Sequence, residues 1–328
     1  MNKTFKSITF ILMSLILLTG CNVTRGDSSS SSSSSSSESK DTSSSEPAYI
    51  YNGETPVFSS DSKSLTYGLY PQNYVSEPNL IESLNSLTKV ESNGWYLYQN
   101  KYYTKIIATP YGKTYEFDNG DLIEANKQYW FSCEPIEWKI LSISSGRYFI
   151  VSSKLLDTHD FYHSDVNRTI EGKTIYPNNY EYSDIRNYLN NDFYNSAFNL
   201  NNQFVLSTSI DNSGPSTRYK NNPYACNDTN DNIFLLSYQD YVNKDYFPIN
   251  TQDVARSTKT TEFARARGAQ TIFNPNSLFH LCANYYTRSP IETYPNYVSY
   301  VYQAGSMEIV TIDKSHYCIR PALNIKVA

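Results

Sequence analysis

Several features that would narrow the function are missing from this 328-residue chain. Beyond the amino-terminal stretch it has no run of Lys or Arg, and its formal net charge is −5. Nucleic acid is therefore not an expected partner, because phosphate binding needs a concentrated basic patch. The sequence also has no CxxC pair of the kind that holds zinc, and no GxSxG elbow for a serine nucleophile. These two kinds of site have no support.

The amino terminus has the three parts of an export signal. Lys3 and Lys6 give a positive start, residues 8–18 form an apolar core, and a small Thr-Gly pair follows. The apolar core is too short for a membrane-spanning helix, which needs about 20 apolar residues. The sequence therefore predicts a signal peptide over residues 1–20.

The end of this signal resembles the lipobox of bacterial lipoproteins, because it reads Leu18-Thr19-Gly20-Cys21. In those proteins the cysteine thiol receives a diacylglyceryl group and becomes the first residue after cleavage. The resemblance implies a lipidated Cys21 that anchors the chain at the extracytoplasmic face of the cell membrane, since two acyl chains suffice for stable binding. An ordinary secretory signal with a chance cysteine is the alternative.

A serine-rich segment over residues 21–48 follows the signal and contains the run from Ser28 to Ser37. It has too few apolar residues to offset the entropy of ordering, so we expect a disordered tether. Residues 49–328 show no second linker in their composition and are short enough for one large domain. We therefore expect a single globular domain behind a flexible tether.

The globular part has the patterns of both helices and strands. Residues 136–143 and 147–153 alternate around a Ser-Ser-Gly turn, which is typical of a β-hairpin. Ser183 precedes a helical pattern, as an N-cap residue does, and residues 261–267 are typical of a short helix closed by Gly268. Further strands are expected at residues 233–236, 297–302, 307–312 and 318–327. Helices in mid-chain between β segments indicate an α+β class rather than repeated βαβ units.

Six motifs, in order, resemble an uncharacterised domain family found in bacterial lipoproteins and other surface proteins. They are EPIEWKIL, YSDIRNYLNNDFYNSAF, DNIFLLS, TEFARARGA, YYTRSP and CIRPALNI. With the earlier segments YGLYPQ and NGWYLYQNKYY, the resemblance covers residues 65–325. The order of a mid-chain helix, an acid-bearing second helix and a terminal arginine strand is also similar to the C-type-lectin-like fold of formylglycine-generating enzymes. The second resemblance implies one C-type-lectin-like α+β domain.

The remaining cysteines are Cys133, Cys226, Cys282 and Cys318, and four cysteines allow three connectivities. The family more often reads WWLRSP and GIRPAL where this chain has YYTRSP and CIRPAL. Cys282 and Cys318 stand beside these two motifs, and both motifs are expected to be strands near the chain end. The resemblance therefore implies a disulfide between Cys282 and Cys318.

A non-catalytic ligand site is expected around Tyr285, Tyr286 and Arg288. A tyrosine ring offers a stiff amphipathic face, and a guanidinium fork suits bidentate partners. The 31 tyrosines of the chain also have a plainer explanation in AT-rich codons. Arg288, like Arg186 and Arg320, has a structural alternative in which carboxylates or carbonyls hold it inside the fold.

His159 and His163 lie in residues 157–165, the densest group of potential metal ligands in the chain. They would share one face of a helix, as a two-histidine metal site requires. The segment lacks the glutamate of an HExxH motif and follows a strand, so an ordinary polar loop is the alternative.

The sequence thus predicts a lipid-anchored extracytoplasmic protein that acts as a binding or interaction module for a glycan or protein ligand. No cofactor is expected. The first alternative is an extracytoplasmic enzyme that uses a metal near His159, and the second is a purely structural surface protein.

Overall fold

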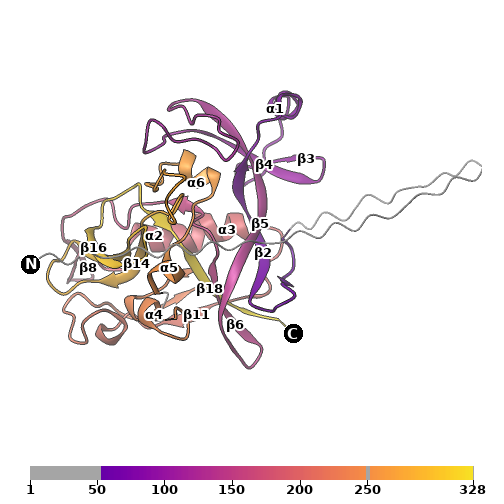
Figure 1. Ribbon diagram of the computed structural model, residues 1–328. Coiled ribbons are helices and arrows are strands. Elements are labelled where there is room, and N and C mark those ends of the chain that lie inside the picture. Colours follow the sequence, from indigo (N-terminus) through magenta and orange to yellow (C-terminus); the bar gives the residue numbers. More distant parts are fainter. Residues whose placement is uncertain (1–52, 249–251, 328) are drawn as a thin grey trace, which may run out of the picture. The chain divides into compact units, whose positions relative to one another are not determined.

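The computed structural model describes residues 53–248 and 252–327 (Figure 1). They lie within one compact unit, Tyr49–Ala328. The predicted signal peptide, Cys21 and the whole of the predicted tether belong to the residues outside the described ranges. In the part of the chain that is described, no helix combines the length and apolar character needed to cross a membrane.

The larger sheet has nine strands. They are β1 (Val57–Phe58), β2 (Ser64–Tyr74), β3 (Tyr96–Tyr98), β4 (Lys101–Ile107), β5 (Gln128–Ser144), β6 (Arg147–Ser152), β10 (Val205–Leu206), β13 (Phe234–Leu235) and β18 (Pro321–Lys326). The main path runs β1-β2-β5-β6-β18-β10, with β13 also on β18 and with β4 joining β3 to β5. Every pairing is antiparallel, so consecutive strands are linked by hairpins or loops.

The long strand β5 holds this sheet together, because it pairs with β4, β2 and β6 along its length. Trp138 on β5 is fully buried, and its Nε1 donates to the Tyr67 carbonyl at 2.7 Å. The β5–β6 hairpin confirms the predicted one. Its turn places Ser145 and Gly146 at φ values of 50° and 74°, the left-handed region that two-residue hairpin turns require.

The second sheet has five strands in the order β16-β15-β14-β17-β7. Their bounds are β7 (Asp157–Thr158), β14 (Tyr285–Pro290), β15 (Tyr297–Val301), β16 (Met307–Thr311) and β17 (Cys318–Ile319). Two further ribbons pair β8 (Arg168–Ile170) with β9 (Lys173–Ile175), and β11 (Thr208–Ile210) with β12 (Thr229–Asp231). The strands predicted at residues 233–236, 297–302 and 307–312 are thereby confirmed. The strand predicted over residues 318–327 is divided, because β17 belongs to the second sheet and β18 to the larger one.

The helices are short. They are α1 (Pro78–Asn85), α2 (Asp184–Tyr188), the π-helical turn η1 (Leu189–Phe193), α3 (Tyr194–Ala197), the 3-10 turn η2 (Gly214–Ser216), α4 (Tyr238–Val242), α5 (Gln252–Arg256) and α6 (Glu262–Ala266). Ser183 is an N-cap as predicted, because its hydroxyl accepts a bond from the backbone of Arg186. Thr261, which was expected inside the helix, caps α6 in the same way through the backbone of Ala264. Figure 1 shows α2 and α3 between the two larger sheets.

The main core forms where these helical turns meet both sheets. Ile185, Leu189 and Phe193 are fully buried and belong to the same cluster as Trp138 and Tyr286. The structure therefore confirms an α+β fold in which most of the regular structure is sheet. The C-type-lectin-like resemblance stays a prediction.

Candidate functional site

The candidate site lies on the outer side of the helical run that starts at Ser183. The Ser183 hydroxyl accepts from the Arg186 backbone N–H at 3.2 Å and donates to the Tyr180 carbonyl at 2.9 Å. α2 then passes directly into η1, and such π-helical insertions are frequent at functional sites. Since Ile185 and Leu189 fill the inner face of this run, its polar residues are left on the outer face.

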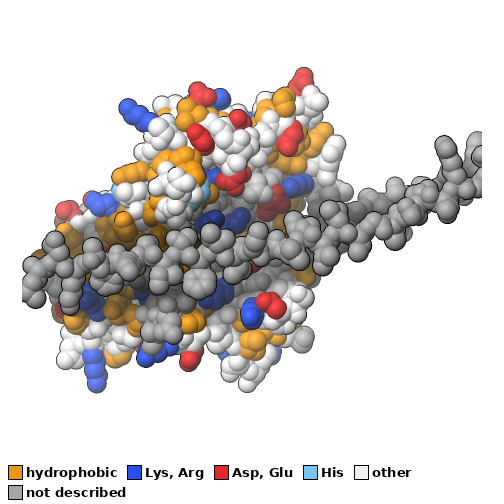
Figure 2. All heavy atoms as spheres, in the orientation of Figure 1, with side chains coloured by type: hydrophobic (Ala, Val, Ile, Leu, Met, Phe, Trp, Pro, Cys, Tyr) orange, Lys and Arg blue, Asp and Glu red, His pale blue; other side chains and the backbone are white. Residues whose placement is uncertain are grey.

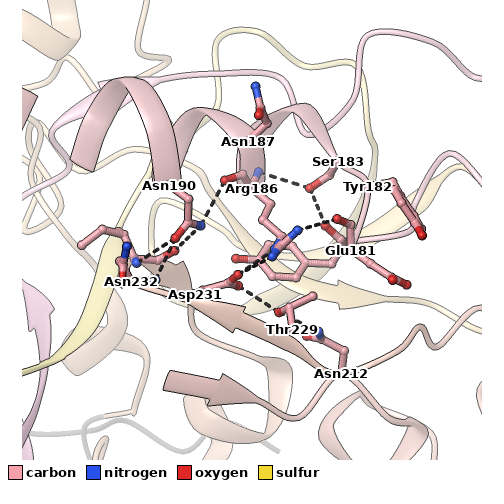
Figure 3. Close-up of polar contacts among 12 residues, drawn as sticks. Glu181, Tyr182, Ser183, Arg186, Asn187, Asn190, Asn212, Thr229, Asp231 and Asn232 are labelled. Carbon is pink, nitrogen blue, oxygen red and sulfur yellow. Dashed lines mark hydrogen bonds and ion pairs between the residues drawn. The ribbon is translucent and has the colours of Figure 1, made fainter. Parts of the chain in front are cut away.

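An ion pair fixes this helical run to β12. The Nε and Nη2 atoms of Arg186 both lie 2.7 Å from Oδ1 of Asp231, and Nη1 donates to the Glu181 carbonyl at 2.8 Å (Figure 3). The Asp231 side chain is fully buried, and its other oxygen accepts from Thr229 Oγ1 at 2.9 Å. Burial alone would lower the pKa of Arg186, but the hydrogen bond and charge of Asp231 raise it. Arg186 is therefore a structural arginine.

Asn190 makes a second connection between the helical run and the loop after β12. Its amide oxygen accepts from the backbone N–H groups of Asn232 at 2.8 Å and Ile233 at 3.3 Å. Its amide nitrogen donates to the carbonyls of Arg186 at 3.2 Å and Ile233 at 2.9 Å. Figure 3 shows Asn190 reaching from the helix toward Asn232. All four bonds join the Asn190 side chain to backbone groups, so this amide is not available to a ligand.

A groove of about 560 Å³ opens along these two connections, and we call it the α2 groove. It is lined by Glu181, Tyr182, Ser183, Asp184, Arg186, Asn187, Asn190, Asn191, Asn230 and Asn232. Asn230 lies on β12 next to the inward-pointing Asp231, so strand alternation turns its amide outward, and Asn232 follows in the bend after β12. Neither amide side chain forms a hydrogen bond within the described ranges, and Asn230 is exposed.

The groove also offers an aromatic ring and carboxylates. Tyr182 is 36% exposed, and Asn187 is exposed one helical turn before Asn191, whose amide donates to it at 2.8 Å. The Glu181 carboxylate accepts from the Asn227 amide at 3.0 Å. Neutral amides, which donate and accept at once, are well suited to hydroxyl groups, while the ring gives a flat amphipathic face.

The predicted ligand residues of β14 are not on this surface. Tyr285 and Tyr286 are fully buried, and the Tyr285 hydroxyl donates to the Arg256 carbonyl at 2.6 Å and accepts from Arg320 at 3.0 Å. Arg288 is 8% exposed and donates to the Leu235 carbonyl at 2.7 Å. It also pairs with Asp240 at 3.0 Å. The predicted placement is corrected for a physical reason: β14 is an inner strand that is buried along its whole length.

The predicted pair of histidine ligands is also separated. His159 and His163 follow β7 in a segment that is not helical, so a spacing of four does not align them. Nδ1 of His163 lies 2.5 Å from Oδ2 of Asp184, whereas Nδ1 of His159 lies 3.0 Å from Oδ1 of Asp160. Within residues 53–248 and 252–327, no three His, Cys, Asp or Glu side chains are arranged to hold a metal ion.

The described cysteines are free thiols, so the structure does not contain the predicted bond between Cys282 and Cys318. Cys318 instead lies opposite Tyr285 in the parallel pairing of β17 and β14, and its backbone N–H donates to the Asn284 carbonyl at 2.8 Å. Cys282 precedes β14 in the chain, and its backbone forms an isolated antiparallel β-bridge with Lys259. Burial raises the pKa of both thiols, which lowers their reactivity.

The sequence interpretation missed the amides of the α2 groove. They lie in the motif YSDIRNYLNNDFYNSAF and just before the strand expected at residues 233–236. A signal was present, because Asn187 and Asn191 are four residues apart and therefore share one face of the helical run. The pairing of the two segments depends on Arg186 and Asp231, which are 45 positions apart.

Residues 145–327 match the family described as a domain of unknown function (DUF6273). This match spans more than half of the sequence. The chain belongs to the DUF6273 family. The α2 groove, β14 and the terminal strands all fall inside the matched residues, whereas the motif EPIEWKIL precedes them. No match was found among curated proteins or among solved structures.

Proposed function

We propose that this DUF6273 protein is a lipid-anchored extracytoplasmic surface protein and that its domain is a non-catalytic module that binds glycans in the α2 groove. The observation that carries the proposal is the set of outward amides from Asn187, Asn230 and Asn232, beside the exposed ring of Tyr182. Hydroxyl-rich ligands match this set, because each hydroxyl both donates and accepts.

The size and charge of the groove favour a neutral ligand. Its volume of about 560 Å³ is within the usual range of roughly 300–1,000 Å³ for small-molecule sites. Arg186 is already paired with Asp231, and the other charged lining residues, Glu181 and Asp184, are acidic. An anionic ligand would meet like charges in the groove, whereas a neutral sugar would not.

The location rests on the sequence at Leu18-Thr19-Gly20-Cys21, which matches a lipobox. Lys and Arg side chains are interspersed with Asp and Glu side chains on the face seen in Figure 2. This mixture supports a partner other than nucleic acid. The proposal includes the C-type-lectin-like relationship, which rests on the order of the mid-chain helix, the second helix and the terminal arginine strand. Superposition of an experimental structure on lectin-like domains tests that part.

Binding is tested by titrating the full chain with neutral oligosaccharides, peptides and divalent metal salts while recording melting curves. A ligand at about 100 times its dissociation constant stabilises the fold by about 2.7 kcal/mol. Asn230→Ala and Asn232→Ala should each weaken glycan binding roughly fivefold, since one hydrogen bond contributes about 1 kcal/mol.

The matched control is Asn276→Ala, because Asn276 is also exposed but does not line the α2 groove. It should bind like the unchanged protein. A melting shift with peptides alone would replace the glycan by a protein ligand. The groove is the wrong site if Asn230→Ala and Asn232→Ala bind glycans as well as Asn276→Ala does.

A further inference from the structure

A second cleft, separate from the α2 groove, lies beside β7 and the end of α6. It has a volume of about 490 Å³, and we call it the histidine cleft. Its lining residues are Thr109, Tyr111, Thr158, His159, Asp160, Arg267, Gly268, Ser315 and His316. None of them lines the α2 groove, so a ligand of this cleft is independent of the proposed glycan site.

The chain is closely packed where α6 meets the cleft. The Thr109 backbone N–H donates to the Ala266 carbonyl at 2.8 Å. Gly268 has a φ of 109°, and a Cβ at this position would lie 3.0 Å from the Thr109 carbonyl oxygen. Glycine is therefore required here both for its backbone conformation and for the close approach. This contact fixes the backbone that carries Arg267.

Arg267 is held from behind by a buried carboxylate. Its Nε donates to Oδ1 of Asp157 at 3.0 Å, and the Asp157 side chain is only 4% exposed. Asp157 also accepts from the Thr158 backbone at 2.7 Å and from the hydroxyls of Tyr70 and Tyr188 at 2.8 Å each. The carboxylate has four donors and needs no other. The charge of Asp157 raises the pKa of Arg267.

The terminal nitrogens of Arg267 remain open. The side chain is 42% exposed, and in the described ranges neither Nη1 nor Nη2 has a hydrogen-bond or ion-pair partner. A guanidinium group carries five N–H donors, and only the Nε donor is used here. The two terminal nitrogens form a fork that suits a planar, two-oxygen acceptor.

His159 and His316 line the histidine cleft together with Arg267. Nδ1 of His159 is bound by Asp160, at 2.7 Å from its carbonyl and 3.0 Å from its carboxylate, so Nε2 is the free ring nitrogen. His316 packs on Tyr111 with ring centroids 4.9 Å apart, and Tyr111 is 50% exposed. These two rings form an aromatic wall.

We infer that the histidine cleft binds a ligand with a single carboxylate next to a flat or apolar group. The carboxylate accepts two N–H bonds from the terminal nitrogens of Arg267. Nδ1–H of His159 already donates to the Asp160 carbonyl, so Nε2 is a further donor to the carboxylate when the imidazole is protonated. The flat group packs on Tyr111. Asp160 is partly exposed in the same cleft, so a doubly charged phosphate is disfavoured relative to a carboxylate.

The test uses the histidine rings as reporters, because the chain has four histidines. The full chain with ¹³C-labelled histidine is titrated with matched probes and followed by NMR. The pairs are glucuronate against glucose, and N-acetylphenylalanine against N-acetylphenylalaninamide, with inorganic phosphate as a third comparison. Single His→Gln variants assign the four ring signals. The two pairs distinguish an acidic sugar from a peptide carboxyl terminus.

The expected result is that at least one carboxylate probe shifts the signals of His159 and His316, while its neutral partner does not. His280 does not line the histidine cleft and should stay unchanged. His163, which is bonded to Asp184 of the α2 groove, reports glycan binding there, so the two proposals fail separately. Arg267→Lys retains the charge but lacks the fork, and should weaken the carboxylate probe at least tenfold.

Three results would overturn the inference. The first is that no carboxylate probe moves His159 or His316 in the unchanged protein. The second is that a neutral probe moves them as much as its carboxylate partner does. The third is that phosphate moves them and neither carboxylate does. Because the first readout uses the unchanged protein, the inference is tested even if Arg267→Lys does not fold.

Discussion

The ion pair under the α2 groove gives the sharpest stability prediction. Replacing Arg186 by leucine leaves the Asp231 carboxylate fully buried, with only Thr229 Oγ1 as a hydrogen-bond donor. Removing one partner of a buried pair costs about 3–5 kcal/mol. Arg186 is 26% exposed and therefore partly screened, so we expect the low end, about 3 kcal/mol. At about 2–4 °C for each kcal/mol, the melting temperature should fall by about 6–12 °C.

The double variant Arg186→Leu with Asp231→Asn separates the ion pair from simple packing. It removes the buried charge, so it should cost only about 1–2 kcal/mol, less than Arg186→Leu alone. Urea denaturation followed by tryptophan fluorescence measures both free energies of unfolding. Arg147→Leu is the control, because Arg147 is exposed and should change stability by less than about 0.5 kcal/mol. The reasoning is refuted if the double variant is less stable than Arg186→Leu.

Three further predictions concern the anchor, the histidine cleft and the core. The unchanged chain should incorporate labelled palmitate in a bacterial host and Cys21→Ser should not; equal labelling would exclude lipidation at Cys21. Burial opposes a proton on His159, but its hydrogen bonds to Asp160 raise its pKa. Because the pKa of His159 is higher in the folded state, protonation of its ring stabilises the fold at pH values below the unfolded-state pKa of about 6.5. This stabilisation is lost as the pH rises through the folded-state pKa. Asp160→Asn should therefore lower the melting temperature more at about pH 5.5 than at about pH 8.5, and an equal loss at both would contradict this. Trp138→Ala should cost about 3–5 kcal/mol in urea unfolding, because the indole is fully buried and donates to Tyr67; a loss below about 1 kcal/mol would mean that this core position can collapse.

Local signals in the sequence predicted the local structure. The alternation around Ser145-Gly146 predicted the β5–β6 hairpin, because strand period and turn residues are both short-range properties. The cap at Ser183 was equally local, since its hydroxyl accepts a bond from a backbone N–H three residues later. From such patterns the α+β class was predictable. The order of strands in the two larger sheets was not, because it depends on long-range pairing.

The failed placement at β14 shows why site prediction is harder. A strand that is open on one face should alternate buried and exposed residues, and the two tyrosines of YYTRSP gave no such pattern. In the folded protein Tyr286 faces the main core, and Tyr285 faces a second core that contains Cys318 and Phe247. A strand between two cores is buried on both sides. Only the tertiary packing determines that, so residues suited to recognition can serve the fold instead.

The α2 groove shows the reverse case, in which structural residues create the candidate site. Arg186 forms hydrogen bonds with Asp231, and Asn190 with Asn232 and Ile233. These bonds hold β12 against the helical run. The amides of Asn230 and Asn232 keep their hydrogen-bonding groups open because these neighbours carry the structural bonds. Since the two segments meet through an ion pair, loss of Arg186 should weaken glycan binding by loosening the groove. A combined loss of stability and affinity in Arg186→Leu, with affinity unchanged in Arg147→Leu, is the outcome that this dependence requires.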